Sequence, residues 1–233
     1  NYYKTSDANE LNRPIGWAGK NWSPHVRFEH EVTRNIAGIF DESSFSKIKV
    51  SGDQAAEFLN LVCANNIDRG INRTVYTQAL NKNGGIEADF TVTKLSEQEF
   101  LIITGTAFLV HDSQWLEKQR EENGFRSIEI TNVTNDLAVF GIWGPKSRDI
   151  LQKLTSQDLN NSEFPFGHSK EINIDGIKLR ATRITYVGEL GWELYVPWDK
   201  GLLIWEKLIE TGSKFGAKAC GYRAIESLRL EKG

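Results

Sequence analysis

The sequence predicts an α+β fold in which two similar units each combine an antiparallel sheet with helices. The dipeptides Asn83-Gly84 and Asp175-Gly176 each separate two strand-like segments and tolerate the positive φ of a tight hairpin turn. A strand that ends in glycine and leads into a helix occurs at Gly52 and again at Gly144. Because strands joined by hairpins pair antiparallel, these observations disfavour a parallel βαβ fold.

The composition is that of an ordinary globular protein. Of the 233 residues, 39% are hydrophobic and 25% are charged, with a net charge of −3. The slight negative charge argues against nucleic acid as a partner, since nucleic-acid binding usually requires a basic surface. No apolar stretch approaches the ~18–20 residues of a membrane span, so no membrane is expected. Cys63 and Cys220 are predicted to be buried thiols in a reducing compartment.

The first unit is preceded by residues 1–27, whose scattered Pro and Gly predict an irregular arm that wraps onto a neighbouring domain. A charged helix is expected over 28–34. Asp53 is predicted to cap the N-terminus of the helix that follows the strand at 47–50. Gly124 is predicted to end the helix that follows the strand at 100–104. The strands of this unit are expected at 47–50, 74–81, 86–95 and 100–104.

The second unit repeats this order. Pro145 suits the first turn of a helix, and Asp199 is predicted to cap a later one. Strands are expected at 138–144, 170–174, 178–184 and 192–196, with a last helix over 222–231. The recurrence predicts two pseudo-repeats within residues 28–233, at about 28–135 and 136–233.

The first hairpin places polar residues on one face of its sheet. If Asn83-Gly84 is the loop, Tyr76 lies opposite Thr91, and both share a face with Gln78 and Asp89. Tyr76 and Asp89 then become diagonal neighbours. An aromatic ring beside a carboxylate suits a flat, nitrogen-rich heterocycle, which can stack on the ring and donate N–H bonds to the acid. From these residues alone, an ordinary solvent-facing surface is the simpler interpretation.

A second carboxylate is set between glycines. Gly188 and Gly191 bracket Glu189, so the backbone can bend and present this acid to a ligand. The alternative is a plain turn residue, followed by Glu193 as a solvent-facing strand residue. No phosphate loop, dinucleotide fingerprint or nucleophile elbow occurs in the chain. His25 and His30 lack the i, i+4 spacing of helical metal ligands, so no metal site is expected.

Together, these segments resemble the folate-binding aminomethyltransferase family, which includes the glycine cleavage T-protein. The motifs that carry the resemblance are Tyr76 with Leu80-Asn81, Gly84-Gly85-Ile86 with Asp89, Gly188–Glu193 and Ser227–Glu231. Segments 40–47, 186–193 and 221–233 look like the C-terminal half of flavin-dependent dimethylglycine and sarcosine dehydrogenases or oxidases. This resemblance implies a folate-binding domain whose C-terminal β-barrel would begin about where the chain ends.

The resemblance also implies site residues. Asp89 matches the family's catalytic acid near the reacting folate nitrogens, Tyr76 and Thr91 match pocket positions, and Glu189 matches the carboxylate that pairs with the pterin edge. The family places an arginine where this chain has Ile225, and Arg223 is a substitute on a different helical face. Only one of the two consecutive acids of the T-proteins is kept here, as Ala88-Asp89.

The implied reaction needs two domains. An upstream domain, for which residues 1–27 would be the linker, would use FAD to oxidise an N-methyl amine of the dimethylglycine or sarcosine type. Tetrahydrofolate bound here would capture the resulting iminium as 5,10-methylenetetrahydrofolate, in the bacterial cytoplasm or the mitochondrial matrix. The alternative is a non-catalytic folate-binding regulatory or interaction domain, and the retained Asp89 favours the enzyme.

Overall fold

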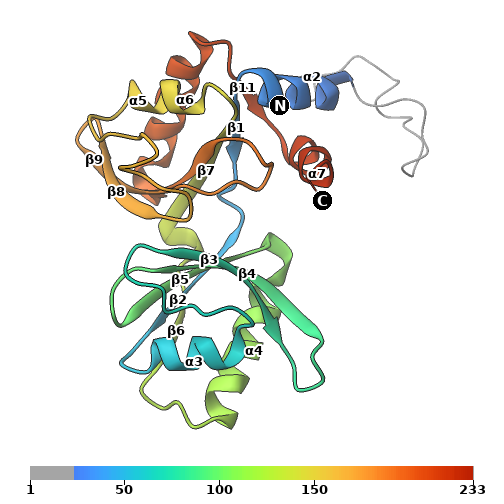
Figure 1. The fold of residues 1–233 in the computed structure, drawn as a ribbon, viewed down its shortest axis with the longest axis vertical. Helices are drawn as coiled ribbons and strands as arrows, with labels where there is room; N and C mark the ends of the chain where they lie inside the picture. Colours follow the sequence, from blue (N-terminus) through green and yellow to red (C-terminus); the bar gives the residue numbers. More distant parts are fainter. Residues whose placement is uncertain (1–23, 233) are drawn as a thin grey trace.

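The structure is a computed structural model, and it describes residues 24–232. It contains two sheets that lie one above the other in Figure 1. The predicted arm over 1–27 falls mostly outside the described residues. Its last part is not irregular, because the first helix begins at Pro24 rather than at residue 28. Proline is favoured in the first turn of a helix, since the N–H that it lacks would have no partner there.

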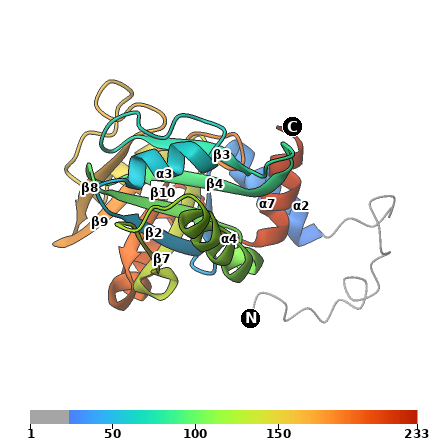
Figure 2. The same ribbon diagram turned by 90° about the horizontal axis from the view of Figure 1, so that it is seen from below.

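The first of the two sheets, sheet B, comes from the first predicted unit. Its strand order is β3-β4-β5-β2-β6, and all its neighbours pair antiparallel. The helices α3 and α4 cover one face of it (Figure 2). Its elements are β2 (Ser46–Ser51), α3 (Ala55–Val62), β3 (Thr74–Leu80), β4 (Ile86–Lys94), β5 (Glu99–Thr104), α4 (Leu109–Glu122) and β6 (Glu129–Asn132), with a 3₁₀ turn (Thr106–Phe108) before α4.

The other sheet, sheet A, has the order β11-β1-β7-β10-β9-β8. Helices α5 and α6 pack on one face of it. Its elements are β1 (Gly38–Asp41), β7 (Leu137–Trp143), α5 (Ser147–Gln152), β8 (Ser169–Ile174), β9 (Ile177–Thr182), β10 (Gly191–Pro197), α6 (Gly201–Ser213) and β11 (Lys218–Cys220), with 3₁₀ turns at Thr134–Asp136 and Trp198–Lys200. At the sheet's edge α2 (Pro24–Asn35) lies beside α7 (Tyr222–Leu230).

The two sheets share a strand order, which agrees with the predicted α+β duplication. Counted from the hairpin edge, sheet B runs β3, β4, β5, β2 and β6, and sheet A runs β8, β9, β10, β7, β1 and β11. Both sheets therefore begin with the two hairpin strands, followed by the strand after the hairpin and then the strand before it. The difference is β1, which falls in the first predicted pseudo-repeat but pairs in sheet A between β7 and β11. Its pairing with β11 is parallel. A strand of four residues carries too little pattern to reveal its partner from sequence.

The free faces of the two sheets meet. Leu101 and Ile103 of β5 pack against Val139 of β7 and Tyr195 of β10. We call this meeting of the two sheet faces the inter-sheet seam. Alternate residues of a strand share a face, and directly paired residues point to the same side. The pairing of Thr91 with Ile103 therefore places Thr91 and Asp89 on the face of sheet B that looks toward the seam.

Two predicted helix caps are wrong. The helix after Asp53 begins at Ala55 with Gln54 in the capping position, and the helix after Asp199 begins at Gly201 with Lys200 there. Neither cap has a side-chain hydrogen bond. The Asp53 carboxylate instead accepts a hydrogen bond from Gln98, while Asp199 lies in a 3₁₀ turn that precedes its helix.

None of the helices within residues 24–232 combines the length and the apolar character that a membrane-spanning helix needs.

We expect Gly144→Ala to destabilise the fold by about 2–4 kcal/mol, from backbone strain and overpacking together. Gly144 has a φ of +139°, and an added methyl group would lie 2.6 Å from both the Ala37 Cα and the Ile36 carbonyl oxygen. Gly124→Ala is the control, because its φ is also positive (+76°) but no atom lies within 4 Å. Urea unfolding should show the larger loss for Gly144→Ala, and equal losses would contradict the argument.

Candidate functional site

The β3–β4 hairpin has the register that the sequence predicts near the candidate site. Tyr76 pairs with Thr91, and Gln78 pairs with Asp89. The turn itself differs from the prediction, because the Gly84 N–H donates to the Asn81 carbonyl and only Gly84 of the turn has a positive φ. The loop is therefore centred on Lys82-Asn83. An irregularity after Ala79 shifts the pairing by one residue and restores the predicted register.

Tyr76 and Asp89 are in contact. The Tyr76 hydroxyl donates a hydrogen bond of 3.0 Å to Oδ2 of Asp89. Burial raises the pKa of Tyr76, and the neighbouring carboxylate raises it further, so the phenol remains a donor at neutral pH. The Tyr76 ring is nevertheless 58% exposed and the Asp89 side chain is exposed, so both are open to a ligand.

Tyr186 brings the second half of the chain to this hairpin. It lies in the segment between β9 and β10 and is 47% exposed. Burial raises its pKa, and among nearby charges Arg229 lowers it while Glu226, Asp89 and Glu42 raise it. The charges that act on Tyr186 thus come from both sheets, since Asp89 is on sheet B and Glu42 follows β1. Two exposed tyrosine rings, Tyr76 and Tyr186, thus accompany the Asp89 carboxylate.

Glu189 is held by an arginine that the sequence analysis did not identify. Nη1 of Arg34 donates to Oε1 of Glu189 at 3.0 Å and to the Val187 carbonyl at 2.6 Å. Gly188 has a φ of +81°, as the prediction of a bent backbone requires. An added methyl group on Gly191 would lie 2.0 Å from the Ile142 carbonyl, so this glycine is needed for close strand packing.

The start of α7 does not bring Arg223 to the hairpin by any contact. Arg223 is exposed and its side chain makes no hydrogen bond or ion pair with the described residues, and Ile225 is buried. The arginine whose charge acts on Tyr186 is Arg229, which makes two hydrogen bonds, of 3.0 and 2.7 Å, to the Glu226 carboxylate. Arg229 lies within one of the motifs on which the family resemblance rests, but its neighbours can be identified only in the folded structure.

Glu193 is buried, which corrects the interpretation that it faces solvent. It is 8% exposed and accepts a hydrogen bond from the Tyr195 hydroxyl. Burial raises the pKa of Glu193 to about 7. The face of β10 that carries Glu193 looks toward the seam. Sheet B covers this face, so Glu193 is enclosed.

Glu193→Gln is expected to remove a pH dependence of stability. With a pKa raised from its ordinary 4.5 to about 7, Glu193 keeps its proton in the folded state at pH values where the unfolded chain loses it. The native protein should therefore lose stability as the pH rises from about 5 to 8, by roughly 3 kcal/mol from this group. Urea unfolding of both proteins at pH 5 and pH 8 measures this difference. An identical pH dependence in the variant would contradict it.

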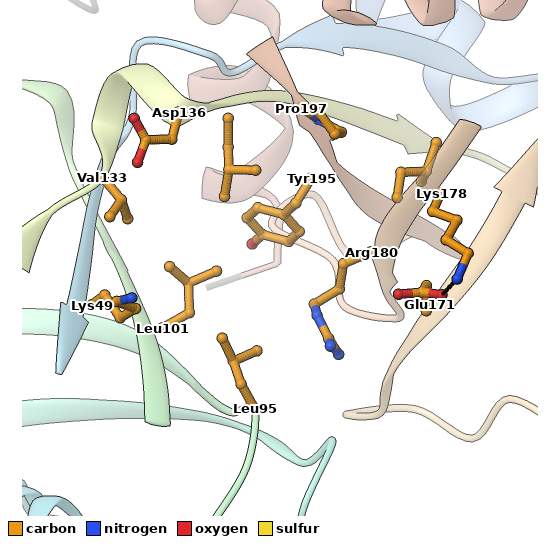
Figure 3. Close-up of a pocket in the computed structure, with 12 residues that line it drawn as sticks. Lys49, Leu95, Leu101, Val133, Asp136, Glu171, Lys178, Arg180, Tyr195 and Pro197 are labelled. Atoms are coloured by element: carbon orange, nitrogen blue, oxygen red, sulfur yellow. Dashed lines mark ion pairs between the residues drawn. The ribbon is translucent and has the colours of Figure 1, made fainter. Parts of the chain in front are cut away.

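A cavity of about 330 Å³ opens at another part of the seam (Figure 3). Its wall combines apolar side chains with charged ones, and Figure 3 shows the Tyr195 ring pointing into it. Neither Asp89 nor Glu189 lines it. The lining residues are Lys49, Leu95, Leu101, Val133, Asp136, Leu137, Glu171, Lys178, Leu179, Arg180, Tyr195 and Pro197. This cavity therefore does not connect the two carboxylates of the predicted site.

The two-sheet fold is that of an aminomethyltransferase-type domain. The crystal structure of the glycine cleavage system aminomethyltransferase T from Bartonella henselae superposes with a TM-score of 0.76 at 28% identity, covering 88% of this chain and 54% of that one. A chain of the heterotetrameric sarcosine oxidase from Corynebacterium sp. U-96 shares the fold, with a TM-score of 0.60 at 15% identity over 84% of this chain and 94% of that one.

The GCVT N-terminal domain family matches residues 2–233, and the chain belongs to this family. It is 37% identical to the mitochondrial dimethylglycine dehydrogenase of Rattus norvegicus over 212 residues, which are 91% of this chain and 24% of that protein. It is 36% identical to the aminomethyltransferase of Thermoanaerobacter pseudethanolicus over 225 residues, which are 94% of this chain and 60% of that protein. The chain thus spans a quarter to three fifths of these relatives.

Proposed function

We propose that this domain binds tetrahydrofolate and transfers to it a one-carbon group from an N-methyl amine of the dimethylglycine or sarcosine type. The product would be 5,10-methylenetetrahydrofolate. The observation that carries the proposal is the Tyr76–Asp89 pair, exposed on the seam-facing side of the hairpin and accompanied by Tyr186. Membership of the family supports it.

The residues present fit a pterin ring. Oδ2 of Asp89 is engaged by Tyr76, and Oδ1 has no partner among residues 24–232, so Oδ1 is free to accept an N–H of a heterocycle. The exposed rings of Tyr76 and Tyr186 offer apolar faces for stacking. Glu189 has Oε1 fixed by Arg34, which leaves Oε2 to pair with a second N–H edge.

The chemistry asked of these side chains is modest. Folate supplies the nucleophilic nitrogens when it is bound, and the domain's task is to hold them in place against an electrophilic carbon. Positioning of this kind supplies up to about 7–11 kcal/mol of a barrier in favourable cases. Asp89 would orient the reacting nitrogen and exchange its proton, and the tyrosines would limit the access of water.

The flavin enters only through another domain. The chain has no dinucleotide fingerprint, and we assign no residue of it to FAD. One sequence relative is a dimethylglycine dehydrogenase, and one structural neighbour is a chain of a sarcosine oxidase. By this likeness, we propose that a separate flavin domain delivers the iminium to this domain.

Titration calorimetry of the intact protein with tetrahydrofolate tests the proposal. We expect saturable binding and, when dimethylglycine or sarcosine is added, the appearance of methylenetetrahydrofolate. Binding without product would favour the non-catalytic folate-binding alternative. The absence of any binding would overturn the proposal.

A further inference from the structure

The cavity in the inter-sheet seam has no part in the site described so far. Two rows of cross-strand partners form its opposite walls. In sheet A, Arg180 of β9 is paired with Glu171 of β8 and with Tyr195 of β10. In sheet B, Lys49 of β2 is paired with Leu101 of β5. All five residues line the cavity, and paired residues point to the same face of a sheet, so the cavity lies between the two sheets.

The cavity lies beyond the end of β4, away from Asp89. Leu95 lines the cavity and directly follows the last residue of β4, six residues after Asp89 along the chain. At ~3.3 Å per residue of an extended strand, this separation is about 20 Å. The cavity is therefore a second place in the domain where a ligand could bind.

The size and the lining of the cavity suit a small organic molecule. Ligand-binding cavities are typically about 300–1,000 Å³ in volume and mostly apolar, with a few polar groups that fix the orientation of the ligand. This cavity has a volume of about 330 Å³. Its apolar lining residues are Leu95, Leu101, Val133, Leu137, Leu179, Tyr195 and Pro197.

Two of the three cations in the wall already have acidic partners. Nζ of Lys49 lies 3.6 Å from Oε1 of Glu99. Nζ of Lys178 lies 3.4 Å from Oε1 of Glu171, and Figure 3 shows this ion pair. The remaining cation is Arg180, which makes no ion pair in the part of the chain that the structure describes.

The guanidinium group of Arg180 is only partly satisfied. Its Nη1 donates to Oδ1 of Asn72 at 2.8 Å and to Oγ of Ser169 at 3.3 Å, whereas Nη2 and Nε have no hydrogen-bond partner among residues 24–232. Burial lowers the pKa of Arg180, and the charge of Glu171 raises it. Figure 3 shows the guanidinium group extending into the cavity. A half-buried arginine with two free N–H edges is suited to a carboxylate, which it can bind with two parallel hydrogen bonds.

Asp136 limits what the ligand can carry at its other end. This acid also lines the cavity and makes no ion pair with a described residue. In Figure 3, it lies on the other side of the Tyr195 ring from Arg180. A second anionic group placed there would be repelled, because like charges brought together at a binding site cost free energy. The lining therefore favours a single carboxylate on an apolar body.

We propose that this cavity binds a small organic monocarboxylate, with the carboxylate on Nη2 and Nε of Arg180 and the apolar body against Leu101 and Tyr195. The site is separate from the proposed folate site and gives the domain a second ligand. Because its walls come from both sheets, the bound molecule would join the two sheets at this end of the seam. A ligand that binds only the folded state stabilises it, so occupancy should also raise the free energy of unfolding.

Calorimetric titration of the intact protein with sodium octanoate tests the site. We expect saturable binding with a Kd below about 1 mM. Suberate, the dicarboxylate with the same chain length, and octylammonium should each bind at least ~10-fold more weakly. The first adds an anion near Asp136, and the second places a cation against Arg180.

Three variants test the assignment of residues. Arg180→Met should weaken octanoate binding at least ~10-fold, since it removes the charged hydrogen bonds. Lys49→Met is the matched control, because it removes the same charge from the same cavity at a residue already paired with Glu99, and it should bind octanoate within about threefold of the native protein. Leu95→Trp keeps Arg180 but fills part of the cavity, so it should weaken binding at least ~10-fold even if Arg180→Met does not fold.

The affinity for tetrahydrofolate separates this inference from the proposed function. It should stay within about twofold in Leu95→Trp and when the native protein is saturated with octanoate. Octanoate binding without folate binding would count against the proposed function alone. The inference would be overturned by a failure of the native protein to bind octanoate, by competition between octanoate and tetrahydrofolate, by equal octanoate binding in Arg180→Met and Lys49→Met, or by unchanged binding in Leu95→Trp.

Discussion

Asp89→Asn is expected to lower the formation of methylenetetrahydrofolate by the intact protein by at least ~100-fold, the range in which general acid–base groups act. Asparagine has nearly the same shape and can still accept the hydrogen bond from the Tyr76 hydroxyl. It cannot take up a proton, and its amide places N–H donors where a ligand N–H would need an acceptor. Because Asp89 is exposed, the free energy of unfolding should change by less than ~0.5 kcal/mol.

Glu87→Gln is the matched control for this variant. Glu87 is on the same strand two residues earlier, and its Oε1 accepts a hydrogen bond from the Asn81 amide, which a glutamine oxygen can also accept. The same loss of one negative charge should leave product formation within about twofold, since Glu87 makes no contact with Tyr76. Product formation by Asp89→Asn at the native rate, or an equal loss in both variants, would show that Asp89 has no specific role.

The face of the hairpin could be predicted because it depends on a local rule. Side chains alternate along a strand, so a turn placed correctly to within one residue fixes which residues lie opposite Tyr76. The sequence predicts the turn at Asn83-Gly84, one residue too late, yet the irregularity after Ala79 compensates for this error before the strand reaches Tyr76. The prediction of a shared face succeeded for this reason.

The buried acids could not be predicted by the same rule. In β10 the alternation places Glu193 and Tyr195 on one face and Trp192 and Leu194 on the other. This pattern says that the two faces differ, but the burial of the polar face depends on a second sheet packing there. Glu42 adds a further non-local cause, because its carboxyl fits only where Gly141 lacks a side chain.

Arg34 was missed for the same physical reason. The sequence placed it at the end of a short charged helix, where an arginine usually faces solvent. Its partners Val187, Glu189 and Leu228 lie 153, 155 and 194 residues further along the chain. No local pattern contains contacts of that range, and the candidate site depends on them because they fix the direction of Glu189.

Arg34→Met is expected to destabilise the protein by about 3 kcal/mol and to weaken tetrahydrofolate binding about tenfold. Arg34 is only 20% exposed and donates to the Val187 and Leu228 carbonyls as well as to the carboxylates of Glu189 and Glu231. Methionine fills much of the same volume but leaves two carbonyls and a half-buried carboxylate unpaired. Glu189 would then lose the bond that orients it, and Arg34→Lys should recover part of both losses because it keeps one charge-assisted contact.

Arg27→Met separates this role from a general effect of removing charge from α2. Arg27 is on the same helix, is 72% exposed and pairs with Glu31 one turn later, so its loss should leave the free energy of unfolding nearly unchanged. Urea unfolding gives the stability of each variant, and calorimetry gives its folate affinity. If Arg34→Met bound folate as the native protein does while losing stability, Arg34 would serve only to join α2, α7 and the segment before β10. If the two arginine variants were equally stable, even that structural role would be wrong.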